Sequence, residues 1–81
     1  MSVADLIPGM APKRAEKFDE RKGVWFVTVT PPEFMGGESR TVILSTEQYR
    51  RYASWRAGTQ LIQNALPELT AGERETLMSG L

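Results

Sequence analysis

Residues 24–30, with the sequence VWFVTVT, form the stretch that decides the fold. The segment is dense in β-branched and aromatic residues and ends at a pair of prolines, a combination typical of a β-strand. Because side chains alternate between the two faces of a strand, Trp25, Val27 and Val29 share one face. We expect that face to be buried, with Phe26 on the opposite face as the alternative buried aromatic.

Two further strands are expected beside this one. Residues 40–44 (RTVIL) indicate the next strand, and the loop of residues 31–39 before it is too short for a parallel crossover, which favours antiparallel pairing. Gly36 and Gly37 in that loop are interpreted as turn residues. The charged segment 13–22 favours an outer strand through residues 17–19 that turns at residues 20–23.

The second half of the chain changes to helical periodicity. Ser45 followed by Gln48 has the pattern of a capping box, so a helix is expected to begin at residue 46. Its apolar side chains follow at helical spacing, and they are Tyr49, Tyr52, Ala53 and Trp55. Gly58 interrupts or ends this helix.

Two shorter helices are expected after Gly58. Residues 59–66 form one, which stops before Pro67 because proline disfavours helical geometry in the residue before it. Thr70 and Glu73 have the spacing of a second capping box, and Gly80 is placed to end the helix that follows.

Together these patterns predict one α+β domain over residues 1–81. A small antiparallel sheet of two or three strands (region 13–44) is followed by two or three short C-terminal helices (region 45–81) packed on one face. Residues 1–12 are expected to be an extended arm or partly disordered. The expected core consists of Trp25, Val27, Val29, Val42, Leu44, Tyr52, Leu61, Ile62, Leu66, Leu69 and Leu77.

The composition excludes several classes of function. The 81 residues contain no Cys and no His, which removes disulfides, thiol nucleophiles and the commonest general base and metal ligand. No serine, carboxylate or glycine pattern forms a catalytic or phosphate-binding motif, so neither an enzyme nor a cofactor or metal site is expected. No apolar run is long enough to cross a membrane, and we expect a cytoplasmic protein.

The charge is balanced overall, with ten basic and ten acidic residues, but it is spread unevenly. Residues 40–58 contain Arg40, Arg50, Arg51 and Arg56 beside Tyr49, Tyr52 and Trp55. This group has the composition of a protein-binding or nucleic-acid-binding surface. The favoured interpretation is that the aromatic residues pack on the sheet while Arg50 and Arg51 are solvated, and the neutral net charge further weakens the nucleic-acid hypothesis.

Gln63 and Arg74 are two further candidates for partner contact. The alternative interpretation, rated slightly ahead, is that they bridge the helix–loop–helix by hydrogen bonds to free carbonyls near Pro67.

Residues 55–80 resemble a block found in small, mostly uncharacterised proteins of bacteriophages. The shared pattern is W-x-x-G-x-x-L-I-Q-x-A-x-P-x-L followed by E-R-E-x-L-M-x-G. The relatives continue beyond the glycine into a tryptophan-containing tail, whereas this chain stops at Leu81. The resemblance implies a bacteriophage setting and carries no assigned chemistry.

We therefore expect a non-enzymatic binding protein that inhibits or modulates a host complex by protein–protein contact, in the manner of anti-CRISPR proteins. The expected partner-binding residues are Arg40, Arg50, Arg51, Trp55, Arg56, Gln63 and Arg74. The alternatives are a small nucleic-acid-binding protein and a phage structural or assembly protein, and a homodimer is compatible with each. The expected partner is a host protein or protein complex in the bacterial cytoplasm.

Overall fold

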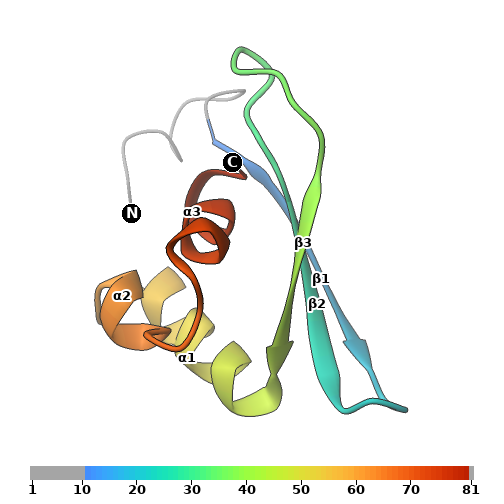
Figure 1. Ribbon diagram of the computed structural model, residues 1–81, viewed down its shortest axis with the longest axis vertical. Coiled ribbons are helices and arrows are strands. Elements are labelled where there is room, and N and C mark those ends of the chain that lie inside the picture. Colours follow the sequence, from blue (N-terminus) through green and yellow to red (C-terminus); the bar gives the residue numbers. More distant parts are fainter. Residues whose placement is uncertain (1–10, 81) are drawn as a thin grey trace.

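The computed structural model describes residues 11–80 as a three-stranded antiparallel sheet covered on one face by helices (Figure 1). The element order is β1 (Lys13–Asp19), β2 (Val24–Thr30), β3 (Arg40–Ser45), α1 (Thr46–Arg56), α2 (Ile62–Ala65) and α3 (Ala71–Ser79). The predicted α+β class, with strands first and helices after, is confirmed. The expectation for residues 1–12 lies almost entirely outside the described residues.

The sheet has the order β1-β2-β3, with the strand of residues 24–30 in the centre. Its register pairs Val27 with Glu16 on one side and with Val42 on the other. The outer strand β1 begins at Lys13, four residues earlier than expected, because its pairing with β2 continues to Thr30. A strand of this composition is stabilised by its partner strand more than by its own β propensity.

Tight turns and caps join these elements as the sequence predicts. Gly23 closes the β1–β2 turn with a φ of 65°, and its N–H donates to the Asp19 carbonyl at 2.8 Å. Both expected capping boxes are present, at Ser45 before α1 and at Thr70 before α3. Gly80 ends α3 in the left-handed conformation, with a φ of 85°.

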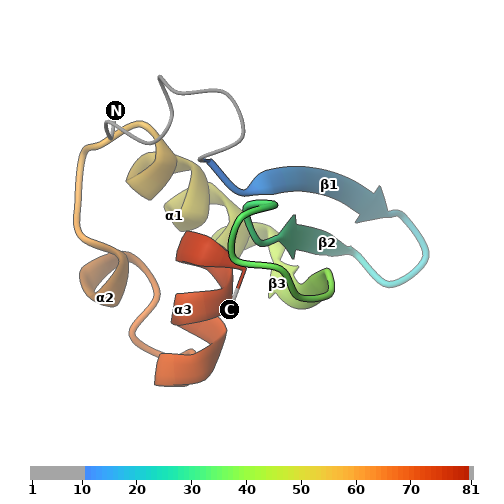
Figure 2. The ribbon, with the colours of Figure 1, turned by 90° about the horizontal axis from the view of Figure 1, so that it is seen from above.

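The helices form one layer against a single face of the sheet, and α2 lies farthest from the strands (Figure 2). Trp25, Val27 and Val29 point to the covered face, and Phe26 points to the other. The buried hydrophobic residues are Val27, Val29, Val42, Leu44, Tyr52, Ile62, Ala65, Leu66, Leu69 and Leu77. Trp25 is half-buried at the border of this core, and Ala65 belongs to it although it was not expected there.

The prediction that Leu61 belongs to the core is wrong, because this residue is 61% exposed. The second helix is a single turn, Ile62–Ala65, where residues 59–66 were expected. Leu61 is the extended residue that precedes this turn, with a ψ of 151°. One helical turn presents one narrow row of side chains to the core, and Ile62, Ala65 and Leu66 fill it.

Candidate protein-binding surfaces

The aromatic residues of α1 pack inward and continue onto the sheet. Five rings follow one another in what we call the aromatic ladder, composed of Phe18, Trp25, Tyr49, Tyr52 and Trp55. Trp25 and Tyr49 stack face to face, with ring centroids 3.8 Å apart and planes 6° from parallel. The predicted packing of the α1 aromatic residues on the sheet is confirmed for Tyr49, Tyr52 and Trp55.

A carboxylate of β1 holds the two tyrosines of the ladder. The Tyr49 hydroxyl donates to Glu16 Oε1 at 2.5 Å, and the Tyr52 hydroxyl lies 3.4 Å from Glu16 Oε2. The hydrogen bond to Glu16, followed by burial, raises the pKa of Tyr49 to about 12, so its phenol stays protonated near neutral pH. The phenols therefore act as structural donors to this carboxylate.

Arg51 is not solvated, contrary to the favoured interpretation of the sequence. Its Nη2 lies 2.6 Å from Glu68 Oε1, and its Nη1 donates to the Ala65 carbonyl at 3.1 Å. The hydrogen bond from Arg51 lowers the pKa of Glu68. Arg51 thus joins α1 to the end of α2 and to the segment that follows it, so its guanidinium is already engaged within the domain.

Arg74 has the bridging role that was predicted as an alternative to partner contact. Its Nη1 lies within hydrogen-bond distance of three carbonyls that follow α2, at 3.3 Å from Leu66, 3.3 Å from Pro67 and 3.0 Å from Leu69. The Pro67 and Leu69 carbonyls lie between α2 and α3, where no helix supplies backbone donors, and the Leu66 carbonyl also accepts from the Leu69 N–H at 3.3 Å. Gln63 does not share this role: it is exposed, and its side chain forms no hydrogen bond with residues 11–80.

Two guanidinium groups lie near the ring of Trp55. Arg14 Cζ lies 5.4 Å and Arg56 Cζ 5.8 Å from the ring centroid, distances at which a cation is attracted to an aromatic face. Arg14 also donates to the carbonyls of Leu77 and Met78 at the end of α3, the latter at 3.1 Å. The sequence analysis gave Arg14 no role, because its partners lie more than 60 residues away along the chain.

The seven predicted partner-binding residues therefore do not form one surface. Arg40 lies on β3, Arg50 on the exposed side of α1 at 3.8 Å from Glu47, and Gln63 on α2. Among them, Arg56 lies over the ring of Trp55.

A stronger candidate is the loop between β2 and β3, which projects beyond the end of the sheet (Figure 1). It presents two adjacent apolar side chains to solvent, Phe34 at 65% exposure and Met35 at 46%. The loop turns through hydrogen bonds from the Met35 and Gly36 N–H groups to the Pro32 and Glu33 carbonyls. Gly36 and Gly37, with φ of 66° and 106°, complete the turn as predicted from their residue type.

The base of this loop is anchored to the domain. Pro31 and Pro32 are buried, and Pro31 packs so closely on Gly80 that a Cβ at residue 80 would lie 2.7 Å from the Pro31 nitrogen. Thr30 Oγ1 and Ser39 Oγ are hydrogen-bonded at 2.5 Å across the base. The Phe34 and Met35 side chains are thus presented from a folded turn.

Sequence reasoning missed Phe34 and Met35 because it assigned the loop only to turn geometry. The available signal was their position, two large apolar residues between a pair of prolines and a pair of glycines. Such residues have no strand or helix whose buried face they could join.

The sheet face away from the helices is a second open surface. It carries Ile43, which is 56% exposed, beside the half-buried Phe26. Thr28 and Thr41 continue this face, with their hydroxyls 2.8 Å apart.

No three potential metal-binding side chains lie together within residues 11–80. Helices long and apolar enough for a membrane span are absent from that same range. Comparisons with protein families, curated proteins and solved structures find no match to this chain.

Proposed function

We propose that this chain is a non-enzymatic binding protein that occupies a surface on another protein. The observation that carries the proposal is the β2–β3 loop, which holds Phe34 and Met35 in solvent on an anchored turn. Aromatic residues and methionine are enriched in protein–protein interfaces. A turn that is already folded loses less conformational entropy on binding than a flexible loop does.

The proposed partner is a protein or protein complex of a bacterial host cell, and the proposed effect is inhibition or modulation, as by anti-CRISPR proteins. This part of the proposal is supported by the resemblance of residues 55–80 to bacteriophage proteins. A cytoplasmic site of action follows from the same setting.

The experiment is affinity capture of a partner from a nuclease-treated bacterial lysate, followed by calorimetric titration with the purified partner. The test variant is Phe34→Ala/Met35→Ala, and the matched control is Leu61→Ala, which removes an apolar side chain of similar exposure (61%) elsewhere. Because the three side chains are exposed, all variants should keep the thermal unfolding curve of the unchanged protein.

We expect the loop variant to bind the purified partner at least about tenfold more weakly, while the control binds normally. Equal affinity of the loop variant would refute the loop as the contact site. Recovery that depends on nucleic acid, with an affinity that falls steeply as salt is added, would instead favour the alternative hypothesis of a small nucleic-acid-binding protein.

A further inference from the structure

The two edges of the sheet are unequally protected against pairing with another strand. Five of the seven residues of β1 (Lys13–Asp19) are charged, whereas β3 carries one charge, Arg40, followed by Thr41, Val42, Ile43 and Leu44. Charged residues, lysine above all, are the usual protection of an exposed edge strand. Within residues 11–80 neither outer edge of the sheet pairs with a further strand, and β3 is the less protected of the two, so we call it the open edge.

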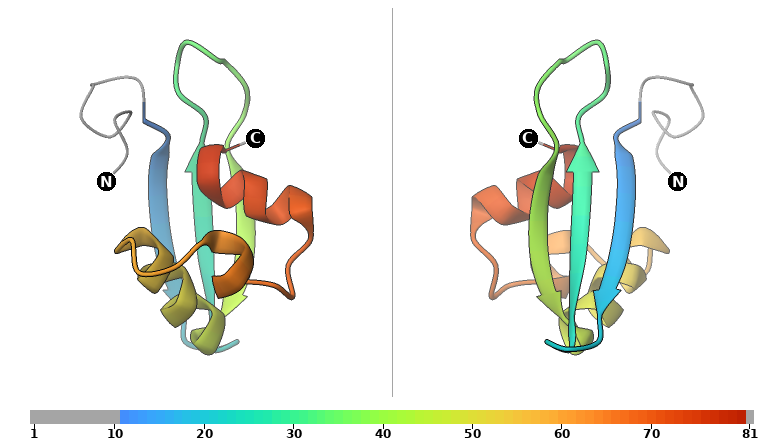
Figure 3. Two further views of the ribbon diagram at one scale, coloured as in Figure 1. Left: turned by 90° about the vertical axis from the view of Figure 1, so that its left-hand side faces the viewer. Right: turned by 90° about the vertical axis from the view of Figure 1, so that its right-hand side faces the viewer.

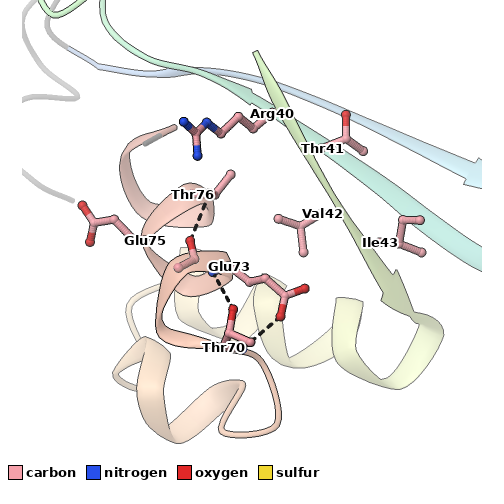
Figure 4. A pocket seen from close by; sticks show the side chains of 9 residues that line it. Arg40, Thr41, Val42, Ile43, Thr70, Glu73, Glu75 and Thr76 are labelled. Carbon is pink, nitrogen blue, oxygen red and sulfur yellow. Dashed lines mark hydrogen bonds between the residues drawn. The ribbon is translucent and has the colours of Figure 1, made fainter. Parts of the chain in front are cut away.

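The helical layer extends past this open edge. Both views in Figure 3 show the N-terminal half of α3 projecting beyond β3. Between them lies a groove of about 650 Å³, and Figure 4 shows the side chains that line it. The β3 side consists of residues 40–43, and the helix side includes Thr70, Glu73, Glu75 and Thr76.

The groove has the geometry of a place for a fourth strand. A strand paired with β3 would lie about 4.8 Å farther out, under the projecting part of α3. Its alternate side chains would point to α3, and the others would extend the open face of the sheet beside Ile43. Addition of an extended segment to a sheet edge beside a helix is a recurring mode of peptide recognition, in which backbone hydrogen bonds supply affinity and alternate side chains supply specificity.

The charges of the groove indicate which segment fits. The helix side carries the carboxylates of Glu73 and Glu75, and the start of β3 carries Arg40. No ion pair within residues 11–80 involves any of these three side chains, so they do not neutralise one another directly. A segment with basic side chains toward α3 would meet the two carboxylates.

We propose that the free edge of β3 and the facing side of α3 bind an extended segment of a partner protein that carries lysine or arginine on its helix-facing side. The site is separate from the β2–β3 loop. A protein with both sites would contact its partner at two places, with the loop in a pocket and the edge along a strand.

The test uses a synthetic peptide, acetyl-TKVKVKT-amide, titrated into the isotope-labelled protein and followed by NMR. We expect the amide signals of residues 41–44 to shift and their hydrogen exchange to slow, with no such change in β1. The matched peptide acetyl-TEVEVET-amide should bind at least about tenfold more weakly, because its carboxylates meet Glu73 and Glu75. Equal binding of the two peptides, changes confined to β1, or no binding by either peptide would overturn the proposal.

Two variants and one control variant make the test specific. Ile43→Lys places the usual edge-protecting residue on β3 and should abolish peptide binding, while Leu61→Lys, at a site of similar exposure (61% against 56%), should not. Glu75→Lys should weaken binding of the lysine peptide and strengthen that of the glutamate peptide.

Sedimentation of the protein without peptide tests whether a second copy of the chain occupies the groove. A dimer that Ile43→Lys converts to a monomer would identify a second copy of the chain at the edge and overturn the proposed partner segment. The Phe34→Ala/Met35→Ala variant should bind the lysine peptide normally. The β2–β3 loop and the β3 edge are therefore tested independently, and a negative result for one does not contradict the other.

Discussion

Replacement of Arg14 by methionine should destabilise the domain more than any other single change of a charged residue in β1 (Lys13–Asp19). The guanidinium donates to the Leu77 and Met78 carbonyls at the end of α3 and lies 3.3 Å from the Tyr52 hydroxyl. It also lies over the Trp55 ring at 5.4 Å. Methionine keeps much of the apolar stem and removes all of these polar contacts.

The magnitude follows from the exposure of each contact. The bond to the Leu77 carbonyl is half-buried and charge-assisted, which corresponds to about 1.5–2 kcal/mol. The exposed Met78 bond, together with the positive charge at a helix C-terminus, adds about 0.5–1 kcal/mol. The contact with Trp55 adds about 0.5 kcal/mol. We therefore expect a loss of about 3 kcal/mol in the free energy of unfolding, a large part of the stability of a domain of this size.

Urea unfolding followed by tryptophan fluorescence measures this loss. The control is Lys17→Met, which removes a positive charge from an exposed position of the same strand and should cost less than about 0.5 kcal/mol. Arg14→Lys should lie between the two, because an ammonium group does not reproduce the fork that reaches two carbonyls. A loss below about 1 kcal/mol for Arg14→Met, or an equal loss for Lys17→Met, would refute the assigned role.

Two further predictions concern the loop base and the tyrosines. In the same urea assay, Gly80→Ala should lower the free energy of unfolding by about 2–3 kcal/mol, because a Cβ at residue 80 would lie 2.7 Å from Pro31 and the φ is 85°. The control Gly23→Ala has open space around its Cβ and should cost about 1 kcal/mol. Equal losses for the two variants would contradict the close approach of Pro31 to Gly80. The pKa of Tyr49 is raised from 10.0 to about 12, so the stability from its protonated phenol is complete below pH 10.0 and is lost as the pH rises toward 12. Glu16→Gln should lower that pKa in an ultraviolet titration of the phenols, and an unchanged titration curve would show that Glu16 is not its cause.

The parts of the fold predicted from the sequence are those specified by neighbouring residues. The capping boxes at Ser45 and Thr70 lie within three residues of their partners, and the strand at 24–30 shows its two faces by alternation alone. The outward position of Leu61 could not be predicted in this way. Its exposure depends on how many helical turns fit between α1 and α3.

The surface was harder to predict than the core. Arg51 has the composition of a binding patch, yet it is held by the Ala65 carbonyl and by Glu68, which only the folded chain brings within reach. The Arg74 bridge to carbonyls near Pro67 was predicted because its partners lie close along the chain. Arginine is suited both to protein interfaces and to free helix carbonyls, so residue type alone does not separate the two roles. In this domain, burial and hydrogen-bond partners distinguish an arginine that binds helix carbonyls from one that is free for a partner.

The contacts between the first strand and the last helix also bear on how the domain forms during translation. Arg14 is hydrogen-bonded to Leu77 and Met78, and Pro31 packs against Gly80. A nascent chain still lacking residues 77–80 can pair its strands, but it cannot complete these contacts while those residues remain inside the ribosome. We therefore expect the domain to reach its full stability only after residue 80 has left the exit tunnel.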